Sequence, residues 1–177
     1  MIYTIGHSIL SAEEFLHLLR GHGVGQLADV RTIPKSRRHP QFARDALDAF
    51  LARHGVTYRH FASLGGLRKP RSDSINTAWQ HPGFRGYADY MQTEEFTRGL
   101  DELLEFSRDG EARSGAVTAV MCAESKWWQC HRRLLSDALL VRGVPVQHIV
   151  SSGAAKPHEL TEFARPEHGK VIYPGLL

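Results

Sequence analysis

The stretch AVTAVMCAE at residues 116–124 indicates the fold more directly than any other part of the chain. Its first six residues are apolar or small, a length that suits a buried strand better than a helix. The polar Cys122 and Glu124 follow directly. Other short runs of this kind are bounded by Gly, Asp or Ser, and we predict strands there, at residues 2–5, 26–30, 56–60 and 144–150, with a further short strand at 171–173.

Amphipathic helical stretches alternate with these strands. Ser11-Ala-Glu-Glu14 has the pattern of a capping box, and it opens a helix that ends in the glycines at 21 and 23. Apolar residues spaced by three and four predict further helices, each ending near a glycine, at residues 41–54, 93–107 and 128–142. This alternation predicts a three-layer α/β/α fold with a mainly parallel sheet of about five or six strands.

Length and composition predict a single globular α/β domain over residues 1–177. Hydrophobic residues make up 42% of the chain, which is enough for a core and excludes a disordered protein. No run approaches the roughly 18 apolar residues that span a bilayer, so no membrane association is expected. Two cysteines and no visible secretory signal predict a cytoplasmic protein without a disulfide. No glycine-rich dinucleotide fingerprint or P-loop is present, so no cofactor is expected.

Polar residues follow the predicted strands at their carboxyl ends, where open parallel sheets bind their ligands. They are His7 and Ser8, Asp29 and Arg31, His60, and Cys122 and Glu124. Two polar segments, 32–40 and 64–83, are long for loops in a chain of this size, and long loops often carry function.

Basic residues cluster in these two loops, although the formal net charge is only +3. Their density suits a phosphate or another anion, and a pair of solvated loops is the alternative. The cluster consists of Lys35, Arg37, Arg38, His39, Arg68, Lys69 and Arg71.

Two carboxylates at different strand ends, Asp29 and Glu124, have the arrangement that general acid/base chemistry requires. Alternatively, Asp29 pairs with Arg31 and Glu124 with Arg132, and both carboxylates are scaffolding. His7 suits a proton shuttle or a phosphate donor, but a lone histidine is more often structural.

Cys122 precedes a predicted helix, where backbone amides can lower a thiol pKa, so it is a candidate nucleophile as well as a candidate core residue. A phosphatase-like loop would need arginine six residues later, where Trp128 stands. Cys122, Cys130 and His131 lack the paired spacing and the fourth ligand of a zinc site, so no metal is expected.

Aromatic residues accompany these segments. Tyr87 and Tyr90 have the spacing of a buried helical face, and base stacking is the alternative. Trp127 and Trp128 could stack on bases or form the surface of a homodimer.

Five ordered motifs, TIGHS (4–8), DVRTIPKS (29–36), LGGLR (64–68), GYADYM (86–91) and MCAESKWWQCHR (121–132), resemble the family called domain of unknown function 488. The resemblance runs from the amino terminus to about Ile149. The resemblance implies a role in nucleic-acid modification or repair, which has been suggested for the family from gene context. Gene context is an association and not a physical argument from the residues. The functional positions that the resemblance implies are His7, Ser8, Asp29, Arg31, Pro34, Ser36, Gly65, Gly66, Arg68, Tyr87, Cys122, Glu124, Cys130, His131 and Arg132.

We therefore expect an enzyme that acts on a nucleic acid or a phosphorylated small molecule in a cleft at the strand ends. The expected catalytic residues are Asp29, Glu124, His7 and Cys122. The expected substrate-binding residues are Ser8, Arg31, Lys35, Ser36, Arg37, Arg68, Tyr87, Trp127, His131 and Arg132. The alternatives are a non-catalytic module that binds nucleic acid or an anion, and thiol chemistry at Cys122 that Cys130 resolves.

Overall fold

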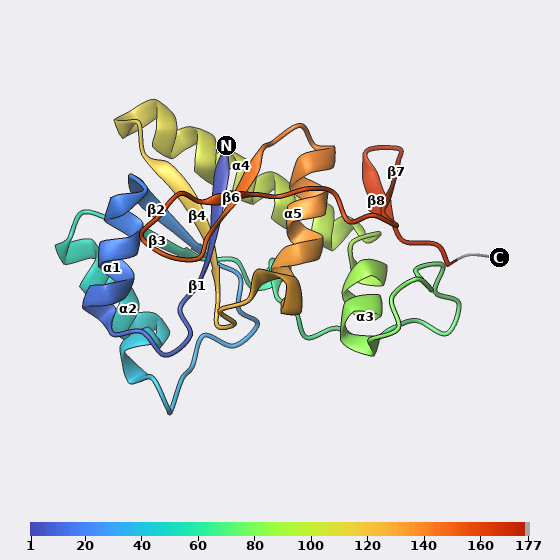
Figure 1. Cartoon of the computed structure of the whole chain (residues 1–177), viewed down its shortest axis with the longest axis horizontal. Helices are drawn as coiled ribbons and strands as arrows, with labels where there is room; N and C mark the ends of the chain where they lie inside the picture. Colours follow the sequence, from blue (N-terminus) through green and yellow to red (C-terminus); the bar gives the residue numbers. More distant parts are fainter. Residues whose placement is uncertain (176–177) are drawn as a thin grey trace.

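A six-stranded sheet forms the centre of the computed structural model, which describes residues 1–175 (Figure 1). Its strand order is β3-β2-β4-β1-β5-β6. The first five strands are parallel, and β6 pairs antiparallel with β5. The strands are β1 (Ile2–Gly6), β2 (Val24–Asp29), β3 (Thr57–His60), β4 (Val117–Cys122), β5 (Val146–Ile149) and β6 (Lys156–Pro157).

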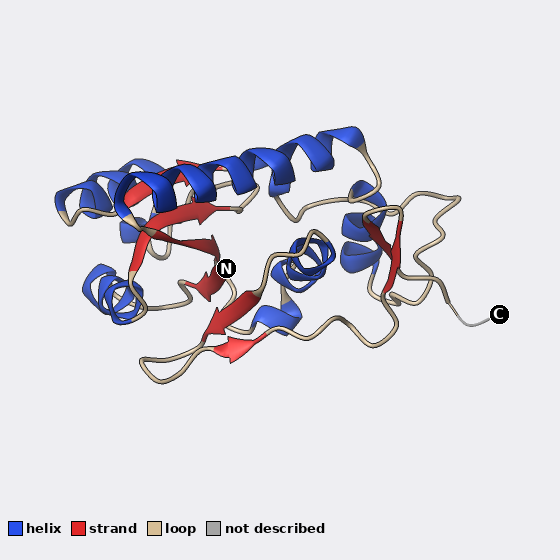
Figure 2. Cartoon of the chain, turned by 90° about the horizontal axis from the view of Figure 1, so that it is seen from above, coloured by secondary structure: helices blue, strands red, loops and turns tan. Residues whose placement is uncertain are grey.

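Helices cover both faces of the sheet, which confirms the predicted three-layer α/β fold. The apolar faces of α1 (Ala12–Gly21) and α2 (Arg44–Arg53) bury Phe15, Leu19 and Leu47 against one side. On the other side lie α3 (Pro82–Tyr90), α4 (Glu94–Ser114) and α5 (Arg132–Val141). Helix α4 packs against β2 and β4, and α5 packs against β5 (Figure 2). Short 3-10 turns span Pro40–Phe42, Ala62–Leu64 and Trp127–Gln129.

Local sequence explains several helix ends. The capping box at Ser11 forms as predicted: the Ser11 hydroxyl accepts from the Glu14 amide, and the Glu14 carboxylate accepts from the Ser11 amide. The helix predicted at 93–107 continues to Ser114, however. Gly110 lies inside the helix and packs against the Gln26 side chain, and Gly115 takes the left-handed conformation (φ 67°) that ends α4.

Two other predicted helices are shorter than expected. The stretch 41–54 divides into a 3-10 turn and α2, because Ala43 between them is extended. The stretch 128–142 becomes helical only from Arg132, since Cys130 is extended (φ −130°, ψ 153°). This break turns Cys130 and His131 toward the end of β4.

The C-terminal segment differs most from prediction. The strand expected at 171–173 is β8 (Lys170–Ile172), which pairs with β7 (Arg165–Glu167) in a separate two-stranded sheet. The main sheet gains its sixth strand from β6 instead. Figure 1 shows β7, β8 and α3 together at the end of the molecule opposite α1 and α2.

No helix among residues 1–175 is both long and apolar enough to cross a membrane.

Candidate functional site

The carboxyl ends of β1, β2 and β4 open onto a cleft of about 880 Å³, which we call the basic cleft. Four cationic side chains line it, three of them exposed, together with four histidines. Glu124 is the only carboxylate among its described lining residues. The cations are Arg31, Lys35, Arg37 and Arg38, and the histidines are His7, His39, His81 and His131.

Nine of the residues expected at the site line this cleft: His7, Ser8, Arg31, Lys35, Ser36, Arg37, Cys122, Glu124 and His131. Strand order explains this convergence, since β4 lies between β1 and β2 and all three strands point the same way. The other five expected residues, Asp29, Arg68, Tyr87, Trp127 and Arg132, lie outside the lining.

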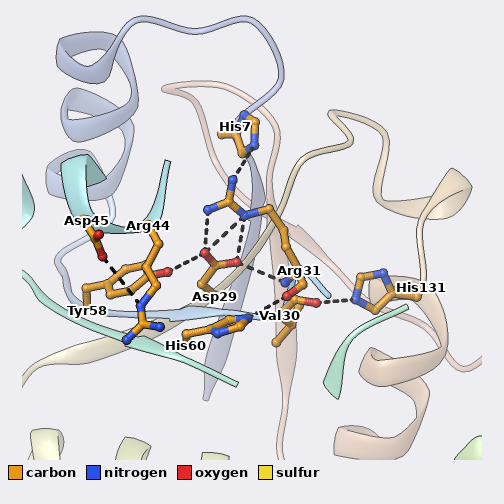
Figure 3. Close-up of polar contacts among 9 residues, drawn as sticks. All are labelled: His7, Asp29, Val30, Arg31, Arg44, Asp45, Tyr58, His60 and His131. Carbon is orange, nitrogen blue, oxygen red and sulfur yellow. Dashed lines mark hydrogen bonds and ion pairs between the residues drawn. The ribbon is translucent and has the colours of Figure 1, made fainter. Parts of the chain in front are cut away.

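A buried ion pair positions Arg31. The Nε and Nη2 atoms of Arg31 donate to the Asp29 carboxylate at 2.9 and 2.6 Å, and the Arg31 amide donates to it at 3.0 Å. The Tyr58 hydroxyl donates to the same carboxylate at 2.6 Å (Figure 3). Burial opposes the charge of Arg31, but the bonds and charge of Asp29 outweigh burial and raise the pKa of Arg31. Asp29 is thus occupied in holding the guanidinium.

His7 lies on the other side of Arg31. Its Nδ1 donates to the Ser8 carbonyl at 3.0 Å, which leaves Nε2 to accept from Arg31 Nη1 at 3.3 Å. Its ring stacks on Phe42, with the centroids 4.2 Å apart. Burial, reinforced by the charge of Arg31, lowers the pKa of His7 to about 4. His7 is therefore neutral near pH 7.

Two further histidines hold the chain segment that follows β2. His60 Nε2 donates to the Arg31 carbonyl at 2.8 Å, and His131 Nε2 donates to the Val30 carbonyl at 3.0 Å. Figure 3 shows the two rings on opposite sides of this segment. The sequence analysis assigned no role to Tyr58 and did not place His60 among the binding residues. Tyr58 and His60 are two positions apart in one predicted strand, so their side chains lie on the same face. The pairing of that strand, β3, with β2 could not be predicted from the sequence.

The two cysteines meet His131 at the inner wall of the cleft. Cys130 Sγ lies 3.5 Å from His131 Nδ1, and Cys122 Sγ lies 3.9 Å from it. The hydrogen bond from Cys122 lowers the pKa of the Cys130 thiol and, together with burial, raises the pKa of the Cys122 thiol.

Arg132 is fully buried, with 1% of its surface exposed. Its Nη2 donates to the backbone carbonyls of Glu124 and Ser125. The alternative in which Arg132 pairs with the Glu124 carboxylate is therefore wrong, because the guanidinium holds the backbone of the turn after β4. Glu124 is exposed, and no cation pairs with its carboxylate within residues 1–175.

The three remaining expected residues have other surroundings. The Arg68 guanidinium lies 3.5 Å above the Tyr90 ring, and its Nε donates to the Gly65 carbonyl. Tyr87 is fully buried, and its hydroxyl donates to the Leu64 carbonyl. Trp127 stacks on His148, with centroids 3.9 Å apart, while Trp128 is 43% exposed.

Comparison with family models gives one match, to the family described as domain of unknown function DUF488, over residues 11–139. The chain belongs to the DUF488 family. Neither the comparison with curated proteins nor that with solved structures gave a match. In this DUF488 chain the matched residues include Arg31 and the Cys122–Arg132 segment, whereas His7 and all of β1 precede them.

Proposed function

We propose that this protein is an enzyme that acts on a phosphate-bearing substrate, a nucleic acid or a nucleotide, in the basic cleft. The charge of the lining carries the proposal. Arg31, Lys35, Arg37 and Arg38 face a cleft with a single carboxylate, and such an excess of cations attracts phosphate. The volume of about 880 Å³ suits a ligand of nucleotide size.

We assign phosphate binding to Arg31 and the exposed cations beside it. Asp29 and Tyr58 hold Arg31 in one orientation, so little side-chain freedom is lost when a phosphate binds. The Nε edge of Arg31 faces Asp29, and Nη1 lies beside His7. Arg31 keeps only 7% of its side chain exposed. A phosphate would approach the edge between Nη1 and Nη2, together with the exposed Lys35 and Arg37.

Glu124 is the candidate general acid or base. It is exposed in the cleft and free of ion pairs among the described residues, whereas both oxygens of Asp29 already accept hydrogen bonds. The neutral His7 can accept a hydrogen bond only at Nε2, and this atom already accepts one from Arg31. Glu124 is therefore the carboxylate best placed to exchange a proton with a substrate.

Binding is tested with labelled single- and double-stranded DNA and RNA oligomers, followed by fluorescence anisotropy at two salt concentrations. We expect Arg37→Ala/Arg38→Ala to weaken binding by about tenfold or more and to make the salt dependence shallower by about 2 in logarithmic slope. The matched control is Arg98→Ala/Arg113→Ala on α4, which removes the same charge away from the cleft. Equal loss in both double variants, or no binding at low salt, contradicts a nucleic-acid site.

Turnover is tested separately on whichever oligomer or nucleotide binds. Glu124→Gln keeps the shape of the side chain and removes its ionisation, so we expect turnover to disappear while affinity changes little. A non-catalytic binding module is the alternative, and it predicts binding without turnover in the unchanged chain. Loss of binding and turnover together in Glu124→Gln would remove Glu124 from the catalytic role.

We retain three accompanying proposals from the sequence. The chain forms one domain, it acts in the cytoplasm, and the exposed Trp128 suits a homodimer contact. The two free cysteines support a reducing location.

A further inference from the structure

We propose that Cys122, Cys130 and His131 bind one Zn²⁺ ion at the inner wall of the basic cleft. Their two Sγ atoms and His131 Nδ1 all lie within 4.8 Å of one another. Tetrahedral zinc has Zn–S bonds of about 2.3 Å and Zn–N bonds of about 2.0 Å, which puts neighbouring ligand atoms roughly 3.5 to 3.8 Å apart. The sulfur–nitrogen distance of 3.5 Å from Cys130 equals the spacing for a sulfur and a nitrogen ligand, and the 3.9 Å from Cys122 exceeds it by a few tenths of an ångström.

The orientation of His131 supports the proposal independently of these distances. A backbone carbonyl can only accept, so the bond from Nε2 to Val30 places the proton of the neutral ring on Nε2. The lone pair of Nδ1 then faces the two sulfur atoms. Metal-binding histidines are held in this way, with the second ring nitrogen donating to a carbonyl or carboxylate that fixes the tautomer.

The backbone around the three residues also keeps the ligand atoms together. Cys122 ends β4, and Cys130 and His131 precede the first turn of α5. The Arg132 amide lies 3.5 Å from Cys130 Sγ and donates to it. Gly66 approaches so closely that a Cβ there would lie 2.5 Å from His131 Nδ1. Any larger residue at position 66 would displace the imidazole from the sulfur atoms.

Two thiolates and an imidazole form a donor set that suits Zn²⁺. The two thiols would release their protons to solvent on binding, and the ion with two thiolates then sums to zero charge. The positive charge of Arg132 remains next to the site. Because all three ligands line the basic cleft, the fourth zinc position is accessible to a water or a substrate oxygen from that cleft. Three protein ligands with one open position are typical of catalytic zinc.

The sequence pattern predicted no metal here because it has no paired cysteine spacing and no fourth ligand. The structure supplies the reason to propose one. Cys122 and Cys130 have seven residues between them, and the extended backbone at Cys130 brings the ligand atoms of Cys122, Cys130 and His131 within 4.8 Å of one another. This inference concerns the three ligands alone and does not depend on which substrate the cleft binds.

The test is a titration of the reduced, chelator-treated full chain with Co²⁺, which serves as a spectroscopic probe for zinc. We expect one ion per chain, with thiolate-to-cobalt charge-transfer absorption and the visible bands of a tetrahedral site, both lost when Zn²⁺ is added. Cys130→Ser and His131→Asn should weaken binding by more than about 100-fold. His81→Ala is the matched control, since His81 lines the same cleft outside the donor set.

Two results would overturn the proposal. The first is a reduced, unchanged chain that gives no charge-transfer band with Co²⁺. This result does not depend on whether any variant folds. The second is a spectrum that Cys130→Ser and His131→Asn leave unchanged while circular dichroism shows them folded. Oligonucleotide binding by the metal-free chain is measured separately, so failure of the phosphate site is distinguishable from failure of this one.

Discussion

A single neutral histidine next to a buried ion pair shapes the inner part of the basic cleft. The bond from Arg31 Nη1 requires the lone pair of His7 Nε2, and a protonated His7 would put a second positive charge against the guanidinium. Asp29 compensates one positive charge and not two, because its carboxylate carries a single negative charge, which already faces Arg31. Folding therefore favours the neutral form of His7.

This preference predicts how stability depends on pH. The pKa of His7 is about 4 in the folded chain against an ordinary value of 6.5, so the unfolded chain binds more protons between these values. The contribution of His7 to the free energy of unfolding is complete above about pH 6.5 and is lost as the pH falls toward 4. Urea unfolding at several pH values measures this decline.

His7→Gln provides the comparison, because its amide oxygen can accept from Arg31 but does not titrate. We expect a shallower fall in the free energy of unfolding between pH 6.5 and 4 than in the unchanged chain. The two pH profiles should differ in slope over this interval and run parallel above it. Identical slopes throughout would mean that His7 titrates normally in the folded state.

At the scale of elements, close packing between α3 and the 64–83 loop depends on Gly86. A Cβ at this position would lie 2.6 Å from the backbone carbon of Lys69, so the helix and the loop meet with no room for a side chain. The same stretch of loop carries Arg68, whose guanidinium lies over Tyr90 of α3. Helix α3 thereby holds the loop that brings Gly66 to His131.

Gly86→Ala should therefore lower the free energy of unfolding by about 1–3 kcal/mol, through overpacking against backbone that cannot move locally. Gly21→Ala is the control, since a Cβ there meets nothing within 4 Å and alanine favours the helix by up to about 1 kcal/mol. Urea denaturation of the two variants should give shifts of opposite sign. A Gly86→Ala chain as stable as the unchanged one would show that the loop can give way.

At the scale of the whole molecule, the fold depends on segments outside the range that matches the family model. The matched region, 11–139, excludes β1, which lies between β4 and β5 in the sheet, and excludes β5 itself. It also excludes Tyr173, which is fully buried and donates to the buried Asp137 at 2.8 Å. The two ends of the chain thus complete the sheet and one face of the core.

We expect a fragment of residues 11–139 not to fold cooperatively, because β4 would lose its β1 neighbour and α5 its cover. Far-ultraviolet circular dichroism during urea titration, compared with residues 1–177, measures this. A sharp transition in the fragment would show instead that the matched region is an independent domain. It would then also contradict the proposal that the chain forms one folding unit.

Local patterns were sufficient for the elements that form from neighbouring residues. The capping box at Ser11, the apolar run before Cys122 and the alternation of strands with helices each depend on residues a few positions apart. They therefore predicted the layered α/β fold and the gathering of polar residues at strand ends. Helix boundaries were less predictable: α4 continues past Gly110, which packs against Gln26, a residue distant in sequence, and ends at Gly115.

The order of residue types along the chain was enough to predict the fold class, and the basic loops were enough to predict the excess of cations in the cleft. How those residues are used depends on contacts that form only in the folded chain. The tertiary structure joined Tyr58 to Asp29, put the Arg132 guanidinium on backbone carbonyls and brought His131 within reach of both thiols. These contacts depend on strand order and on the angle at which each loop leaves the sheet, and both are set by packing between residues far apart in the chain.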